Sequence, residues 1–279
     1  MLNFTNKIAL VFLFTKSEYE KGFIKKCLDS FFENEISKVV SVDLFFFFNK
    51  GDKSLFPDCF SLSKHKNIHN CHFHSFNYSE NLDIYCRSFD EFRRNPKAKT
   101  HVLGGSGGAN LLFYDSFISL LNKNYENYLL LESDSKPVKN QWLDELLGDI
   151  KSKSFLIYGS TYKGIQKLPD FESWTGHLNG IAVYRNNQHL KHLLIESRKF
   201  IAYNVKHNIN KFISFDVGIW MYTQTLNWIN YLKNNNINFK PLINSEVISN
   251  YSLYADINLS ESEILNRNPK TIILHQKWN

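Results

Sequence analysis

Short apolar runs alternate with segments of helical periodicity through the first two thirds of the chain. The segments Lys7–Phe14, Val39–Phe48 and Asn127–Leu131 are dominated by apolar residues, which is typical of strands buried on both faces of a parallel sheet. Between them, Ser17–Asn34 and Ala109–Asn122 carry apolar residues at helical spacing. This alternation predicts an α/β fold with a mostly parallel central sheet flanked by helices.

The same criteria predict seven further elements. The expected strands are Asn67–Phe76, Phe155–Tyr158, Ile181–Tyr184 and Thr271–Leu274. The expected helices are Gln141–Ile150, Gln188–Asn204 and Asp216–Asn234. Because no internal repeat and no Pro-, Gly- or Ser-rich linker divides the chain, we predict a single domain over residues 1–279.

Composition excludes several classes of protein. Of the 279 residues, 43% are hydrophobic and 22% are charged, which excludes a disordered tail, a collagen-like fibre and a coiled coil. The 33 basic residues are scattered and answered by 27 acidic ones, so no basic stripe favours a nucleic-acid partner. The net charge of +6 suits either an anionic ligand such as a nucleotide or a solubilising surface.

Cysteine spacing and the length of the apolar runs bear on the compartment. The four cysteines show no CxxC spacing, which favours reduced thiols over a disulfide framework or a zinc finger. The apolar run from Ile8 to Phe14 is too short for a transmembrane helix and is not followed by a signal-peptide cleavage site. We therefore expect a cytoplasmic protein without a transmembrane segment, with peripheral contact at the inner membrane face left open.

Two carboxylates directly follow the apolar run Asn127–Leu131. Glu132 and Asp134 stand two residues apart, so a turn can aim both at one ion, and Mg²⁺ and Mn²⁺ prefer carboxylate oxygens. In parallel α/β sheets, ligands bind beyond the carboxyl ends of strands, where this motif falls. By itself such a pair is more often a solvated turn, so the motif needs support from elsewhere in the chain.

A polar cluster precedes the predicted strand Ile181–Tyr184. His177 and Asn179 supply directional hydrogen-bond donors and acceptors, and Gly180 permits close approach of a ligand to the backbone. A structured loop without a ligand is the alternative for this segment.

Two more segments carry residues suited to chemistry. Asp216 begins a predicted helix and is either an N-cap or a functional carboxylate. His275 ends the last predicted strand, and Lys277 follows two residues later. A histidine there is usually structural, but together the two side chains could meet a metal ion and an anion.

A glycine-rich segment, Gly104–Gly108, precedes the predicted helix Ala109–Asn122. It matches neither the dinucleotide-binding fingerprint nor the P-loop. Backbone N–H groups at a helix N-terminus nevertheless attract phosphate groups. The segment is therefore either part of an anion site or a loop without a ligand.

In their order along the chain, these segments resemble nucleotide-sugar-dependent glycosyltransferases of the GT-A fold. In that family an acidic D-x-D motif holds the divalent cation that bridges the donor's diphosphate; here the motif would be Glu132–Asp134, with Glu in the first place. The stretch His177–Tyr184 is similar to an H-x-N-G-x-x-x-Y pattern of some members, and Asp216 to the acidic residue downstream of it. Leu274–Lys277 resembles the C-terminal segment whose His often completes the metal shell.

The resemblance implies a GT-A-like, Rossmann-like fold and a metal-dependent transferase. A sugar would move from a nucleotide-sugar donor to a hydroxyl of a glycan or polysaccharide acceptor. Residues 1–135 would form the nucleotide-binding half, and residues 136–279 the half that binds the acceptor and completes the metal site. Mn²⁺ or Mg²⁺ would be held by Glu132, Asp134 and His275.

The resemblance also implies donor and acceptor contacts and, for an inverting enzyme, a general base. The residues expected to contact donor or acceptor are Phe14, Thr15, Ser106, Gly107, Asn110, Ser133, His177, Asn179, Gly180 and Lys277. The candidate bases are Asp216, Asp170 and Glu172. Inverting and retaining mechanisms both stay open.

Two other classes of protein remain as alternatives. A sugar nucleotidyltransferase shares the α/β layout and acidic metal site, but its glycine-rich phosphate loop usually follows the first strand, and Phe14–Glu18 contains no glycine. A non-catalytic carbohydrate-binding relative would use the abundant Trp and Tyr for sugar stacking, although these residues suit a core equally well.

Overall fold

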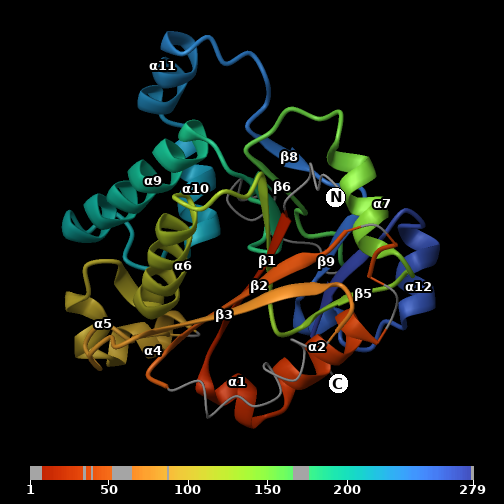
Figure 1. The fold of residues 1–279 in the computed structure, drawn as a ribbon. Coiled ribbons are helices and arrows are strands. Elements are labelled where there is room, and N and C mark those ends of the chain that lie inside the picture. Colours follow the sequence, from red (N-terminus) through yellow and green to blue (C-terminus); the bar gives the residue numbers. More distant parts are fainter. Residues whose placement is uncertain are drawn as a thin grey trace.

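Among the described residues, the central sheet has seven strands, and all but one run in the same direction (Figure 1). The computed structural model describes residues 8–33, 36–38, 40–51, 65–86, 88–165 and 176–277. Across the sheet the strands are β3 (Ile68–Phe76), β2 (Val42–Asn49), β1 (Ile8–Phe14), β4 (Asn127–Leu131), β7 (Ala182–Arg185), β6 (Ile157–Gly159) and β8 (Leu242–Asn244). Strand β7 runs antiparallel to both β4 and β6. The predicted α/β fold with a mostly parallel sheet is therefore confirmed.

The order of the first four strands creates a topological switch point between β1 and β4. The chain places β2 and β3 on one side of β1 and then returns to its other side with β4. Strands β1 and β4 pair in parallel, with Phe12 opposite Leu131. In open α/β sheets, ligands bind beyond the carboxyl ends of the strands at such a point. The residues that follow β1 and β4 are Thr15 and Glu132.

Helices cover both faces of the sheet, which explains why its inner strands β1 and β4 are almost entirely apolar and buried. Helices α2 (Phe23–Phe32) and α7 (Trp142–Ile150) cover the face of β1 that carries Leu10. Helices α6 (Gly107–Leu120) and α9 (Gln188–Lys206) cover the opposite face. Figure 1 shows these two pairs on either side of the sheet.

Two predicted helices are each divided in two. The helix expected after the first strand is α1 (Lys16–Glu20) followed by α2, because Gly22 between them adopts a φ of +72°. The helix expected from residue 216 onward is α10 (Phe215–Thr223) followed by α11 (Leu226–Asn234). Thr225 begins the second of these by accepting a hydrogen bond from a backbone N–H of its first turn.

The elements that the sequence did not predict are short. Among the described residues, the unpredicted helices and turns are α4 (Phe89–Arg94), α5 (Pro96–Thr100), the 3-10 turns η3 (Gly104–Ser106) and η4 (Tyr254–Asp256), and α12 (Glu261–Arg267). Strands β5 (Ser135–Pro137), β8 and β9 (Ile248–Tyr251) were not predicted either. Helix α6 begins two residues before the predicted start, so the last two glycines of the glycine-rich segment belong to it. Within the described part of the chain, no helix is long and apolar enough to cross a membrane.

A second sheet of three strands completes the fold and was also not predicted. Its order is β5 (Ser135–Pro137), β10 (Ile273–Gln276) and β9 (Ile248–Tyr251). Strand β10 pairs antiparallel with β5 and places His275 opposite Ser135. Because β5 starts directly after the acidic motif, this pairing brings the C-terminal histidine next to that motif.

Candidate metal centre

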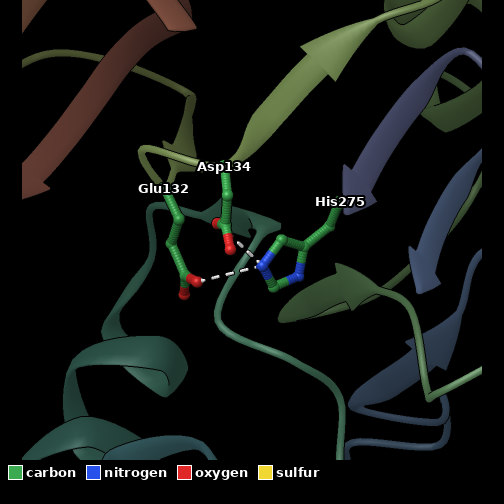
Figure 2. Close-up of side chains that lie close together, drawn as sticks. All are labelled: Glu132, Asp134 and His275. Carbon is green, nitrogen blue, oxygen red and sulfur yellow. Dashed lines mark ion pairs between the residues drawn. The ribbon is translucent and has the colours of Figure 1, made fainter. Parts of the chain in front are cut away.

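Three side chains from two sheets meet beyond the carboxyl end of β4 (Figure 2). Glu132 and Asp134 lie between β4 and β5, and His275 lies on β10. Nε2 of His275 is 2.9 Å from Oδ1 of Asp134 and 3.4 Å from Oε2 of Glu132. One potential ligand atom of each side chain lies within 4.8 Å of the other two. The structure thus brings together the three residues that the sequence singled out as metal ligands.

The backbone of the acidic loop is anchored on both sides. The carbonyl of Glu132 accepts hydrogen bonds from the N–H of Ser135 at 3.1 Å, from its hydroxyl at 2.6 Å and from the Cys27 thiol at 3.3 Å. The N–H of Gln276 donates to the carbonyl of Asp134 at 3.1 Å. The loop is therefore tied to α2 and β10, and the two carboxylates project from a fixed turn.

The three groups shift one another's proton affinity. Burial raises the pKa of Glu132 to about 7, assisted by the charge of Asp134 and only partly opposed by His275. Burial also pushes the pKa of Asp134 upward, but the charge and hydrogen bond of His275 outweigh it, so that pKa lies below its usual value. For His275, burial acts downward and the attraction of Asp134 outweighs it, which raises the pKa of the imidazole.

This donor set fits a divalent cation. Carboxylates suit Mg²⁺ and Mn²⁺, and the imidazole adds a nitrogen ligand that transition metals accept. His275 is only 3% exposed, and its ring turns Nε2 toward both carboxylates, while Nδ1 is buried with no hydrogen-bond partner among the described residues. Two opposed carboxylates in a partly buried site repel each other, and a bound cation would relieve that repulsion.

A second polar pair, His177 and Asp216, lies near Glu132. Nε2 of His177 is 3.8 Å from Oδ2 of Asp216, whose charge contributes to the raised pKa of Glu132. Asp216 is not the N-cap of α10, because Ser214 holds that position and donates its hydroxyl to the Asp216 carboxylate. A Cβ atom on Gly180 would come within 2.5 Å of Oε1 of Glu132, so a glycine is required for this close approach.

A small pocket adjoins this pair. Its polar lining consists of Asn179, Tyr184 and Asp216, and its apolar lining of Ile157, Leu178, Ile219 and Leu242. The backbone N–H of Asn179 donates to Ser160 at 2.9 Å, and its side-chain oxygen accepts from the N–H of Ile181 at 3.1 Å. Leu178 and Asn179 of the predicted His-x-Asn-Gly segment thus line a hollow beside Asp216, with a backbone held by hydrogen bonds.

Glu18 is a site residue that sequence reasoning missed. Its carboxylate accepts hydrogen bonds from Thr15, at the start of α1, and from the Ser133 hydroxyl at 2.7 Å. The signal for it was present, because Thr15 and Glu18 have the spacing of a capping box directly after the first strand.

The amides of the glycine-rich segment are engaged within the chain. The N–H of Gly105 donates to Lys211 at 2.8 Å, and the N–H of Gly108 donates to Ile84 at 2.7 Å. The N–H of Gly107 donates back to Gly104. These bonds hold two distant loops together and use groups that an anion would need.

The side chains of this region are packed as well. A Cβ atom on Gly107 would lie 2.2 Å from the ring of His101, and Ser106 is 5% exposed. Asn110 is fully buried, and its amide donates to the carbonyls of Leu103 and Ile213. The structure does not bring these residues into contact with the metal cluster, and their role in donor binding stays a prediction.

The remaining predicted residues are placed as follows. Phe14 is 1% exposed and stacks within the core, whereas Thr15 is exposed. Lys277 follows β10, and its charge helps to lower the pKa of Asp134. Asp170 and Glu172 lie outside the described residues.

Comparison with solved structures finds a protein of similar fold. No protein-family model matches the chain, and no curated protein matches it. Among solved structures, mouse xyloside xylosyltransferase 1 in its apo form matches 96% of this chain and 97% of its own, with a TM-score of 0.53. The chain shares the fold of a glycosyltransferase. At 12% sequence identity the likeness concerns the fold alone.

Proposed function

We propose that this protein is a metal-dependent glycosyltransferase that moves a sugar from a nucleotide-sugar donor to a hydroxyl of a glycan or polysaccharide. The observation that carries the proposal is the meeting of Glu132, Asp134 and His275 at the switch point of the sheet. The likeness in fold to a xylosyltransferase supports glycosyl transfer as the reaction.

In this proposal, the residues around the cluster have different roles in the reaction. Glu132, Asp134 and His275 hold Mn²⁺ or Mg²⁺, which when bound supplies Lewis-acid stabilisation of the leaving diphosphate. Lys277 adds positive charge beside the phosphates, where negative charge develops. Ser133 lies between the two carboxylates and contacts the donor.

The nucleoside of the donor would lie at the end of β1, against Phe14 and Thr15. The segment with Ser106, Gly107 and Asn110 would flank it. His177, Asn179 and Gly180 would bind hydroxyls of the donor sugar or the acceptor in the adjoining pocket. Residues 1–135 then bind the nucleotide, and residues 136–279 bind the acceptor and complete the metal site.

Asp216 is our first choice as general base in an inverting mechanism. Its side chain is 14% exposed, lines the pocket and lies near His177, so an acceptor hydroxyl bound there would have a carboxylate within reach. Asp170 and Glu172 stay as the other proposed bases.

A cytoplasmic protein of this kind would contact its acceptor at a membrane face. Among the described residues, four of the eight exposed large apolar side chains surround the glycine-rich segment, and we call them the rim patch: Leu82, Tyr85, Val102 and Ile209. The segments 82–105 and 203–212 carry seven Lys or Arg against three Asp or Glu, a net +4 of the chain's +6. Apolar side chains among basic ones suit the anionic inner face of a membrane.

A thermal-shift panel tests the proposed function. UDP, GDP, CMP, CDP and TDP are each added with Mn²⁺, Mg²⁺ or EDTA, because a ligand that binds only the folded state stabilises it by ~2.7 kcal/mol at a hundredfold excess over its Kd. We expect one nucleotide to raise the midpoint only with metal, and Asp134→Ala to abolish the shift. A thermal shift that persists in EDTA would contradict metal dependence. No shift with any nucleotide would favour a carbohydrate-binding protein.

A separate activity measurement tests the other alternative. Metal-dependent turnover of a nucleoside triphosphate would favour a sugar nucleotidyltransferase.

A further inference from the structure

The side chain of Glu18 joins two segments that are far apart in the sequence. Oε2 accepts hydrogen bonds from the N–H of Thr15 at 2.8 Å and from its hydroxyl at 2.7 Å, and Thr15 Oγ1 accepts from the N–H of Glu18 at 3.3 Å. Oε1 accepts a hydrogen bond from the Ser133 hydroxyl at 2.7 Å. Each carboxylate oxygen thus serves a different segment.

This link crosses the switch point of the sheet. Thr15 follows β1, and Ser133 follows β4, the neighbouring parallel strand. Ser133 is the middle residue of the acidic loop and is 7% exposed. Because Ser133 is bonded to Glu132 and Asp134 through the backbone, holding its side chain restricts the backbone from which both carboxylates project.

Capping of α1 alone does not require a carboxylate. Glutamine serves equally in a capping box, since one side-chain oxygen is enough to receive the N-cap. A carboxylate offers two accepting oxygens, whereas an amide offers one. The charge also has a cost here, because it adds to the raised pKa of Glu132. The second oxygen is therefore the feature that suits Glu18 to its place.

We propose that Glu18 is a positioning residue that holds Ser133, and through it Glu132 and Asp134, in the geometry that binds the divalent cation. The inference rests on the proposed function in one respect, the binding of a metal ion by these carboxylates. Glu18 itself is not a ligand in this proposal, because its two oxygens are occupied by Thr15 and Ser133.

The chain contains a matched control for the capping part of this arrangement. At the start of α12, Ser260 and Glu263 form the same capping box, with bonds of 2.8, 2.6 and 3.3 Å. Glu263 caps only its own helix in this network, which is exposed to solvent. Glu263→Ala therefore removes a capping box, whereas Glu18→Ala removes a capping box and the link to the acidic loop.

The experiment measures Mn²⁺ affinity by titration, with the loss of the free-ion electron paramagnetic resonance signal as readout. We expect Glu18→Ala and Ser133→Ala each to weaken Mn²⁺ binding about 10- to 100-fold, the range for groups that orient metal ligands. The double variant should be no weaker than the worse single one, because each change acts on the metal site through the same Glu18–Ser133 hydrogen bond. Glu263→Ala should bind Mn²⁺ like the wild type, although its thermal midpoint falls by an amount similar to that of Glu18→Ala.

The outcomes separate this inference from the proposed function. Failure of the wild type to bind Mn²⁺ or Mg²⁺ would overturn the proposed metal site, and the positioning role with it. Wild-type binding that survives Glu18→Ala unchanged would overturn the positioning role alone. Independent losses in Glu18→Ala and Ser133→Ala that add in the double variant would also overturn it, since the two residues would then act separately.

Discussion

The acidic loop 132–134 and the glycine-rich segment 104–108 differ in how they use their polar groups. In the acidic loop, side chains of like charge face each other, and the pKa of Glu132 is raised to about 7 by burial and by Asp134. In the glycine-rich segment, backbone amides are bonded to neighbouring loops, and added side chains would clash with them. The acidic loop holds a carboxylate, Glu132, whose charged form is disfavoured in the metal-free protein, which suits a ligand, whereas the glycine-rich segment serves packing.

Opposed carboxylates are therefore a stronger indication of a functional site than a run of glycines. Glycines are chosen for backbone reasons, and close packing of loops is as good a reason as a phosphate. Opposed carboxylates in a partly buried place have no comparable structural benefit. Substitutions in the acidic loop should therefore lower metal affinity, whereas substitutions in the glycine-rich segment should lower the free energy of unfolding.

The largest effect is expected for Asp134→Asn. The change keeps the size of the side chain but removes the charge closest to His275, so Mn²⁺ affinity should fall at least ~100-fold, more than for loss of an outer-shell group. Isothermal titration with Mn²⁺ measures it. Asp29→Asn, which breaks only an exposed pair with Lys25 on α2, is the control and should leave affinity unchanged. Equal Mn²⁺ affinities of Asp134→Asn and Asp29→Asn would show that the acidic loop does not bind the metal ion.

Gly104→Ala should cause the largest loss of stability. Gly104 has a φ of +72°, and its Cβ would lie 2.2 Å from the carbonyl oxygen of Lys211, so the free energy of unfolding should fall by about 2 kcal/mol or more. Gly148→Ala on α7 is the control, because no atom lies within 4 Å and alanine favours a helix; it should stabilise by up to ~1 kcal/mol. Urea denaturation measures both. If folded Gly104→Ala keeps the Mn²⁺ affinity of the wild type, the glycine-rich segment serves stability and not metal binding. A loss of Mn²⁺ affinity in this variant would contradict that division.

The parts of the fold that could be predicted are those with a long, regular apolar pattern. Strand β1 is an uninterrupted apolar run, and helix α9 is long enough for its helical spacing of apolar residues to be recognised. The closing strand β10 was predicted, but its partners β5 and β9, with three and four residues, are too short to show a period, so the second sheet was missed. The sequence nevertheless indicated His275 through its place at a strand end.

The candidate site was predicted in the same uneven way. Glu132 and Asp134 were found because the motif is local, and their meeting with His275 required the resemblance to a family. Glu18 was missed as a site residue because its capping-box spacing with Thr15 indicates only the start of a helix, and Ser133, which it also contacts, is 115 residues away. Asp216 was given an N-cap as its alternative role, but α10 begins one residue earlier than predicted and Ser214 is the cap.

Glu132→Gln should stabilise the metal-free protein. The raised pKa of Glu132 means that its charged form is disfavoured by burial and by neighbouring carboxylates, so a neutral isostere should add about 1 kcal/mol to the free energy of unfolding at pH 8. Chemical denaturation in EDTA measures it. The same variant should bind Mn²⁺ more weakly than the wild type. A loss of stability instead would mean that the carboxylate is a structural group like the glycines.

The rim patch offers a test of what surrounds the glycine-rich segment. Val102 and Ile209 are 60% and 64% exposed, so replacing both with serine should weaken binding to vesicles of anionic and zwitterionic lipid about fivefold, since each buries some apolar surface in the bilayer. Leu226→Ser with Ile229→Ser on α11, which are 75% and 50% exposed, is the matched control, because Figure 1 shows α11 apart from α4 and α5. Flotation at low and high salt measures binding. Equal losses in both variants, or no binding by the wild type, would contradict a docking role for the patch.

The smallest effect concerns the pH dependence of stability at His101. Burial lowers the pKa of this histidine, and its Nδ1 accepts a hydrogen bond from the N–H of Leu103 at 2.9 Å, so the folded protein holds it neutral. The unfolded chain takes up the proton first as the pH falls below ~6.5, and the stability present above that pH is progressively lost. Between pH 7.5 and pH 6 the loss from this group is at most ~0.8 kcal/mol, and His101→Gln should remove it while the other histidines contribute equally to both proteins. The unfolding free energy could instead depend on pH in the same way in His101→Gln and in the wild type. That result would show that the packing of the His101 ring against Gly107 does not require a neutral imidazole.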